Sequence, residues 1–257
     1  MSLTPDRNDL VTYSGHATTV IELDGAILVT DPVLRSRLMH LRRQVPESLL
    51  TEPDAVLLSH QHFDHLDLPT LRRFGPDVRI IAARGIGRLL ARKGFRQVEE
   101  VAVGDRVAVG PVTVTAVPAE HDGRRHPFAR PGEAVGFLIE GTRSVYFAGD
   151  TDLYEELADH VSGVDLALLP VWGWGHTLGP GHMDPDSAAR AAALIGPRLA
   201  IPIHWGTLFP VGLARWRGQH LERPPREFAE RVADYSPGTE VRVLEPGQSM
   251  PLPSARS

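Results

Sequence analysis

The chain contains no cysteine among its 257 residues. Cysteine supplies disulfide bonds, thiolate ligands for zinc and iron–sulfur clusters, and the nucleophile of cysteine hydrolases. Its absence therefore excludes all of these kinds of chemistry. Histidine, by contrast, is abundant, with 12 residues.

The chain also lacks a surplus of basic residues and a long apolar run. Its 27 lysines and arginines stand against 32 aspartates and glutamates, for a formal net charge of −5. A dedicated nucleic-acid-binding protein normally carries a basic face, so we expect no nucleic-acid partner. No apolar stretch approaches the roughly 20 residues that span a bilayer, so we expect no transmembrane segment. The start, Met-Ser-Leu-Thr-Pro-Asp-Arg, has no apolar region of a secretory signal, and we expect a cytoplasmic protein.

Glycine and proline, 24 and 22 residues, are spread along the chain rather than gathered in a linker. A chain of this length fits one compact domain. We therefore predict a single domain over residues 1–257, with a core over about 11–245 and mobile ends.

Short aliphatic and β-branched runs bounded by turn residues predict strands. These runs are 11–14, 19–23, 27–30, 55–58, 78–82, 112–117, 135–139, 144–147, 166–169 and 199–203. Helical patterns cover 85–93, 152–158, 185–194 and 223–235, and the third begins with Asp184 as N-cap and a proline at its first position. The arginine-rich stretch 35–43 is interpreted as an exposed helix face. The order of these elements favours an α/β fold, with helices on the outer faces of sheets.

The strongest chemical feature is the sequence Ser-His-Gln-His-Phe-Asp-His at 59–65, directly after a predicted strand. In an extended segment His60, His62 and Asp64 point to the same side, and a turn at Asp64 brings His65 alongside. Four candidate ligands in one loop at the end of a rigid strand are what a preorganised metal site needs. Imidazole and carboxylate ligands suit zinc, manganese, iron or nickel. The alternative interpretation is a polar loop with solvated histidines.

Three later polar residues, His121, Asp150 and His204, also end apolar runs. Gly149, directly before Asp150, permits a close approach of the backbone. We expect the three side chains to converge with the histidine motif at one edge of the packed sheets. Taken singly, Asp150 is equally consistent with a helix cap, and the two histidines with ordinary loop residues.

The motif at 60–65, followed by His121, Asp150 and His204, resembles the metallo-β-lactamase superfamily. Two earlier stretches, Tyr-Ser-Gly-His-Ala-Thr-Thr at 13–19 and Leu-Val-Thr-Asp-Pro-Val at 28–33, resemble one branch of it. That branch contains ascorbate-6-phosphate lactonases and N-acyl-phosphatidylethanolamine phospholipase D. The similarity extends from about residue 11 to about residue 207.

The resemblance implies an αββα sandwich of two mixed sheets, with helices on the outer faces and a dinuclear centre at the sheet edges. It assigns His60, His62 and His121 to a first metal, Asp64, His65 and His204 to a second, and Asp150 to a bridge between them. It implies two divalent metal ions, with zinc expected first and manganese or iron as alternatives. Since the cysteine ligand of many true β-lactamases is absent, antibiotic hydrolysis is not the expected native role.

These ligands predict a metal-dependent hydrolase. Coordination lowers the pKa of water to about 7, and we expect a metal-bridging hydroxide to attack a carbonyl carbon or a phosphorus. Two cations with the carboxylates of Asp64 and Asp150 and one hydroxide leave a net charge of about +1, which favours an anionic small-molecule substrate. The expected substrate is a phosphodiester, a phosphorylated lactone or a related small ester. Asp64 is a candidate catalytic residue that orients the nucleophile.

His182 is the second catalytic candidate. It lies in Gly-Pro-Gly-His-Met-Asp-Pro at 179–185, just before a predicted helix, and the phospholipase-like branch has a histidine in a similar context. A substrate contact or proton donor is one interpretation, and a structural loop histidine is the other.

Four further residues are candidates for substrate binding. His16 matches the branch motif, and we favour a supporting or pocket role for it. Trp172 and Trp174 alternate with glycine, so they suit the wall of a pocket, although aromatic residues more often pack in a core. Arg125 suits a phosphate or carboxylate group, and the alternative is solvated surface charge.

Two other functions remain open at this point. A metal-binding scaffold or sensor without catalysis has the same ligands, and the superfamily also includes RNA-processing nucleases, although the net charge of −5 argues against a nuclease. Relatives of the lactonase and phospholipase type assemble, which makes a homo-oligomer an expectation from resemblance alone.

Overall fold

The strands of the protein form two large sheets and one small sheet. The structure is a computed structural model that describes residues 9–45, 52–124, 132–173, 179–213 and 217–254. In order of pairing, the first sheet contains β17 (Ser249–Pro251), β1 (Leu10–Gly15), β2 (Thr18–Leu23), β3 (Ala26–Thr30), β6 (Ala55–Leu58), β7 (Arg79–Ala83) and β8 (Gln97–Val101). The second contains β16 (Glu240–Val241), β14 (Leu199–Ile203), β13 (Leu166–Pro170), β12 (Ser144–Phe147), β11 (Val135–Glu140), β10 (Val112–Pro118) and β9 (Arg106–Val109). The small sheet contains β15 (Leu208–Pro210), β5 (Leu41–Arg43) and β4 (Arg37–Leu38).

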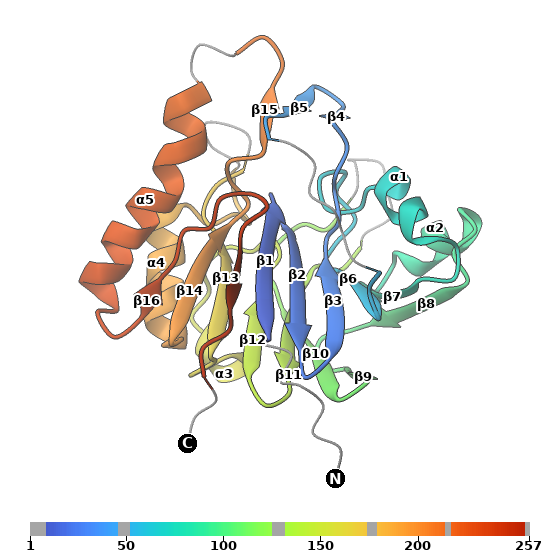
Figure 1. The fold of residues 1–257 in the computed structure, drawn as a ribbon, viewed down its shortest axis with the longest axis horizontal. Coiled ribbons are helices and arrows are strands. Elements are labelled where there is room, and N and C mark those ends of the chain that lie inside the picture. Colours follow the sequence, from blue (N-terminus) through green and yellow to red (C-terminus); the bar gives the residue numbers. More distant parts are fainter. Residues whose placement is uncertain (1–8, 46–51, 125–131, 174–178, 214–216, 255–257) are drawn as a thin grey trace.

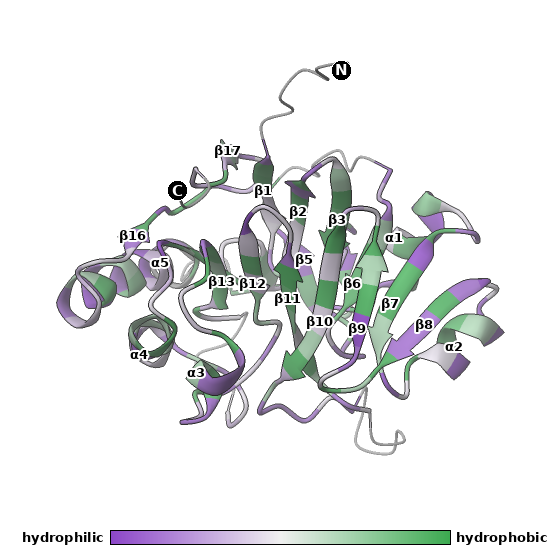
Figure 2. Cartoon of the chain, turned by 90° about the horizontal axis from the view of Figure 1, so that it is seen from below, coloured by the Kyte–Doolittle hydropathy of each residue, from purple (hydrophilic) through white to green (hydrophobic). Residues whose placement is uncertain are grey.

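The two large sheets pack face to face over one hydrophobic core (Figure 2). Tyr13 and Leu57 of the first sheet and Phe137 and Phe147 of the second belong to the same buried cluster. Both sheets are mixed, since β2 pairs antiparallel with β1 and β3 whereas β6 pairs parallel with β3 and β7, and β12, β13 and β14 run parallel. The predicted α/β architecture of two mixed sheets is therefore confirmed.

The helices lie outside the sheets (Figure 1). They are α1 (Leu68–Leu71), the 3-10 turn η1 (Arg72–Phe74), α2 (Gly87–Arg92), α3 (Leu157–His160), α4 (Pro185–Ile195) and α5 (Arg217–Tyr235). Helices α4 and α5 pack on each other and on β13 and β14, and α2 packs beside β8. Among the described helices, none combines the length and the apolar character that a membrane crossing requires.

Several predicted elements differ from the structure. The predicted helix over 152–158 is wrong in position, because α3 begins at Leu157. The Thr151 hydroxyl donates to the Asp152 carbonyl, and the Asp152 carboxylate accepts from the amides of Leu153 and Gly181. These side-chain hydrogen bonds to the backbone compete with helix formation there. The stretch 35–43 forms β4 and β5 instead of a helix. Strand β17 pairs with β1 beyond the expected core boundary at 245 and covers the edge of the first sheet.

The parallel strands place the polar residues of the sequence motifs together. His60 follows β6, Asp150 follows β12 and His204 follows β14, so each residue stands just beyond the carboxyl end of a buried strand. In Figure 1 these strand ends point toward the small sheet, whereas both termini lie at the opposite edge. The apolar runs thus build the core and bring the polar residues after them to one edge.

The start of α4 yields a first test. The Asp184 carboxylate accepts a hydrogen bond from the Ser187 amide at 2.8 Å, and the Ser187 hydroxyl accepts one from the Asp184 amide. Replacing Asp184 by alanine removes this acceptor and should lower the free energy of unfolding by about 1 kcal/mol. Urea denaturation should show Asp184→Asn close to the wild type, and equal losses in both variants would contradict the capping role.

Candidate metal centre

Two groups of ligand atoms meet at the edge of the sandwich. In each group, the four histidine and carboxylate atoms lie within 4.8 Å of one another. The first group is His60, His62, His121 and Asp150, and the second is His16, Asp64, His65 and His204. Asp150 also reaches the second group, with Oδ2 3.1 Å from Nε2 of His65 and Oδ1 3.1 Å from Nε2 of His204. The seven predicted ligands are thus brought together, and Asp150 stands between the two groups.

The backbone around this centre adopts uncommon conformations. His204 has φ +64° and Asp31 has φ +33°, values that residues other than glycine rarely adopt. Gly149 has φ +63°, and a Cβ there would lie 2.7 Å from Cβ of Ser59. Glycine is therefore required before Asp150, because the two loops that carry the ligands touch at this point.

In four of the histidines, Nδ1 donates a hydrogen bond to an oxygen atom outside the ligand groups. Nδ1 of His60 donates to the Ser59 hydroxyl at 2.9 Å, Nδ1 of His65 to the carboxylate of Asp31 at 2.8 Å, and Nδ1 of His121 to the carbonyl of Gly181 at 2.8 Å. Nδ1 of His204 donates to the carbonyl of Trp172. Because Nδ1 donates in all four rings, Nε2 is the nitrogen that faces the centre, and in the neutral imidazoles of His60, His121 and His204 this atom keeps a lone pair.

Asp31 orients one histidine of each group. Its carboxylate is fully buried and accepts hydrogen bonds from the Ser59 amide at 2.8 Å, from the Ser59 hydroxyl at 2.5 Å and from Nδ1 of His65. Ser59 then accepts from Nδ1 of His60, so the same carboxylate acts on His60 indirectly. Burial lowers the pKa of His65, but the charge of Asp150 and the hydrogen bonds that His65 donates to the carboxylates of Asp150 and Asp31 outweigh it and raise that pKa well above its ordinary value.

The protonation states suit metal ligands. Burial lowers the pKa of His60 well below its ordinary value, that of His121 to about 4 and that of His204 to about 3, so these imidazoles are neutral at pH 7. Burial alone would raise the pKa of Asp64 and Asp150, but the surrounding histidines outweigh it and hold both well below the ordinary range. Neutral imidazole and ionised carboxylate are the forms that bind metal ions.

The donor set fits divalent metal ions. Nε2 of His60 is buried and has no hydrogen-bond partner among the described residues, although it faces three other ligand atoms of its group. Nε2 of His65 lies 3.0 Å from Nε2 of His204, and Nε2 of His121 lies 3.1 Å from Nδ1 of His62. Such clusters of inward-facing nitrogen atoms are stabilised when a cation binds between them, since imidazole and carboxylate are its usual ligands.

His182, a catalytic candidate, and Trp172, a candidate for substrate binding, lie beside this centre. Nε2 of His182 is 3.5 Å from Oδ2 of Asp150, and its side chain remains 20% exposed. Trp172 is half-buried, and its carbonyl holds His204. Trp174 and Arg125 lie outside the described residues.

Sequence reasoning singled out the candidate ligands that the structure brings together but missed the residues that orient them. Asp31 directly follows a buried strand, β3. A polar residue at the end of an apolar run was also the signal that predicted the candidate ligands, so it could have indicated Asp31. The carbonyls of Trp172 and Gly181 carry no such signal, because their partners His204 and His121 come from distant parts of the chain. Ser59 lies next to His60 in the sequence, but its link to Asp31 spans 28 positions.

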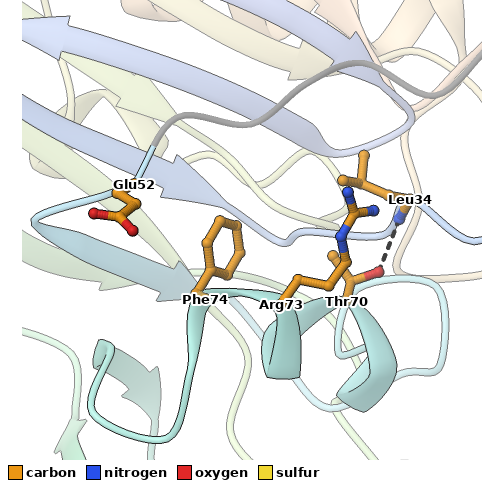
Figure 3. A pocket seen from close by; sticks show the side chains of 5 residues that line it. All are labelled: Leu34, Glu52, Thr70, Arg73 and Phe74. Atoms are coloured by element: carbon orange, nitrogen blue, oxygen red, sulfur yellow. Dashed lines mark hydrogen bonds between the residues drawn. The ribbon is translucent and has the colours of Figure 1, made fainter.

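A separate hollow of about 110 Å³ lies away from the ligands (Figure 3). Leu34, Glu52, Thr70, Arg73 and Phe74 line it, and the amide of Leu34 donates to the Thr70 hydroxyl at 3.0 Å. None of the predicted metal ligands lines this hollow.

Comparisons with known proteins agree with the geometry. A model of the beta-lactamase superfamily domain matches residues 27–205. A UPF0173 metal-dependent hydrolase of Methanopyrus kandleri is 33% identical over 250 residues, which cover 93% of this chain and 98% of that protein. The chain belongs to the UPF0173 metal-dependent hydrolases of the metallo-β-lactamase superfamily. A second UPF0173 relative, from Aeropyrum pernix, is 32% identical over 258 residues and covers 93% of this chain and 96% of that protein.

Solved structures share the metallo-β-lactamase fold. A metallo hydrolase from Ignicoccus hospitalis has a TM-score of 0.71 and 25% identity, and the match covers 94% of this chain and 97% of that chain. An isothiocyanate hydrolase from Delia radicum gut bacteria has a TM-score of 0.73 and 18% identity, over 95% of this chain and 100% of that one. The second likeness shows the fold alone.

The links from Asp31 and Ser59 yield a second test. Ser59→Ala removes the acceptor of His60, whereas Asp31→Asn removes the negative charge that accepts from Nδ1 of His65 and from the Ser59 hydroxyl. Since loss of such an orienting group typically costs 10–100-fold in metal affinity, we expect about that loss in both variants. Zinc titration against a chelator measures it. Asp165→Asn, which alters a buried carboxylate just before β13, should bind zinc like the wild type. Unchanged zinc affinity in Asp31→Asn would contradict the orienting role.

Proposed function

We propose that the protein hydrolyses an anionic phosphodiester, phosphorylated lactone or related small ester with two divalent metal ions. The observation that carries the proposal is the presence of two adjacent groups of four histidine and aspartate residues, with Asp150 in contact with both groups. His60, His62 and His121 would hold one ion, Asp64, His65 and His204 the other, and Asp150 would bridge them. Zinc is the first candidate, and manganese and iron are alternatives.

The charge of the centre supports an anionic substrate. Two divalent cations exceed the two negative charges that Asp64 and Asp150 supply, so the occupied centre remains positive. The resemblance of residues 13–19 and 28–33 to lactonases of phosphorylated sugars and to phospholipases supports the same substrate class.

The metal ions, when bound, lower the pKa of water toward about 7 and polarise a carbonyl or phosphoryl oxygen. The residues of the chain hold the reacting groups in place. Asp64 lies at the edge of the second group, where its carboxylate can accept a hydrogen bond from the attacking water and orient it.

His182 supplies the proton that the leaving oxygen needs. Its ring lies 4.7 Å from that of His121 and its Nε2 lies 3.5 Å from Asp150, so it stands at the rim of the first group. Its side chain is partly exposed, and it can therefore contact a substrate that enters from solvent. Trp172, His16, Trp174 and Arg125 are proposed to shape or contact the substrate pocket.

Hydrolysis of a chromogenic phosphodiester tests this function. We expect metal-dependent turnover after reconstitution with zinc or manganese, and loss of both turnover and the second metal in Asp150→Ala. Glu155→Ala, which removes an exposed carboxylate nearby, serves as the control. Activity on esters and lactones but not on the phosphodiester would assign attack at carbon. A chain that binds both metals and hydrolyses none of these substrates would instead be a scaffold or sensor.

A separate test addresses His182. We expect His182→Gln to lower kcat by about 10²–10⁴-fold while two metals per chain are retained, because proton transfer by a positioned side chain contributes that much. His160→Gln, at an exposed histidine on α3, should retain the wild-type kcat. A kcat within about threefold of the wild type in His182→Gln would assign a structural role to His182.

A further inference from the structure

His16 differs from the predicted ligands in how it meets the centre. It lies in the turn between β1 and β2, and its side chain is only 1% exposed. Its Nε2 lies 3.0 Å from Oδ2 of Asp64. Its ring packs against that of His204, with centroids 3.8 Å apart and the two planes tilted by 36°. His16 is therefore packed against the second ligand group and contacts one carboxylate of that group directly.

The chain holds His16 in a strained conformation. Its φ is +56°, and its amide donates to the Thr207 hydroxyl at 2.8 Å while its carbonyl accepts from the His204 amide at 2.7 Å. Gly15 before it permits this approach, because a Cβ there would lie 2.5 Å from Oγ1 of Thr207. Backbone strain of this kind persists only where the surrounding contacts impose it, and it is common at functional sites. The two sheets therefore fix the position of this ring relative to His204.

The hydrogen-bond partners decide which nitrogen of His16 carries the proton. In His60, His65, His121 and His204, Nδ1 donates to an oxygen, and Nε2 is the nitrogen that faces the centre. Nδ1 of His16 is buried and has no hydrogen-bond partner within the described part of the chain. A buried N–H without an acceptor is costly, so in neutral His16 the proton resides on Nε2, where the Asp64 carboxylate accepts it. Neutral His16 thus has the opposite tautomer to neutral His60, His121 and His204.

We propose that His16 is a positioning residue that donates a hydrogen bond from Nε2 to Asp64 and so fixes the carboxylate that binds the second metal. The inference rests on the proposed two-metal centre. A direct ligand role for His16 would move its proton to Nδ1, which has no acceptor among the described residues. A direct substrate contact requires an accessible Nε2, whereas this atom is buried against Asp64.

Two substitutions separate these roles. A glutamine at position 16 can place its amide N–H where Nε2 lies and keep the donor to Asp64. An asparagine is shorter, so its amide does not reach Asp64, and asparagine tolerates a positive φ well. Equal thermal unfolding midpoints for His16→Asn and His16→Gln would show that both variants fold.

Titration of the metal-free chain with cobalt(II) against a chelator gives the main measurement. We expect two binding steps in the wild type, and a second step about 10–100-fold weaker in His16→Asn with the first step unchanged. His16→Gln should restore the second step to within about threefold of the wild type. An unchanged second step in His16→Asn would overturn the inference. Equal losses in both variants, with a changed visible spectrum of bound cobalt, would also overturn it and make His16 a ligand.

Nitrogen-15 NMR of the histidine rings tests the inference without metal. The proton of His16 should reside on Nε2, and a proton on Nδ1 would overturn the inference. If the wild-type chain binds a single metal ion, the two-metal proposal fails, and the ring tautomer of His16 alone then decides whether it donates to Asp64. The two failures are thus distinguishable.

Discussion

The buried carboxylate of Asp31 links the two halves of the candidate centre. It accepts from Nδ1 of His65 directly and from Ser59, which in turn accepts from Nδ1 of His60. One negative charge without solvent contact therefore sets the orientation of a histidine in each ligand group. Burial raises the pKa of Asp31, and three hydrogen bonds, all from residues next to or within the histidine motif, offset part of the desolvation of its charge.

The sandwich provides the rigidity that this arrangement requires. The parallel strands β6, β12 and β14 are buried, and each ends directly before or near a ligand. The loops after β6 and β12 approach so closely that a side chain at position 149 would clash with Ser59. His204, after β14, and Asp31, after β3, have positive φ values. A centre whose donors must lie within 4.8 Å of one another depends on such constraints, because an independent loop would not hold its ligands at these distances.

The strands of the core could be predicted because their apolar runs are long enough to be buried, as in β10 and β14. Strand β8 was not predicted, since its residues are mostly exposed and include two glutamates. The start of α3 was misplaced because the side chain of Asp152 bonds the backbone of Leu153 and Gly181 rather than a helix. Gly181 lies 29 positions from Asp152, and a local sequence pattern carries no information about so distant a partner.

The same division holds for the centre. The sequence by itself determined which side chains can bind metal, because histidine and aspartate at the ends of buried runs are evident from local order alone. The tertiary structure alone decided which nitrogen of each histidine faces the centre. That choice depends on the acceptor of the other nitrogen: Asp31 for His65, the Trp172 carbonyl for His204, and no described acceptor for Nδ1 of His16. These acceptors come from segments that only folding brings together, so the orientation of each of these imidazole rings follows from the fold.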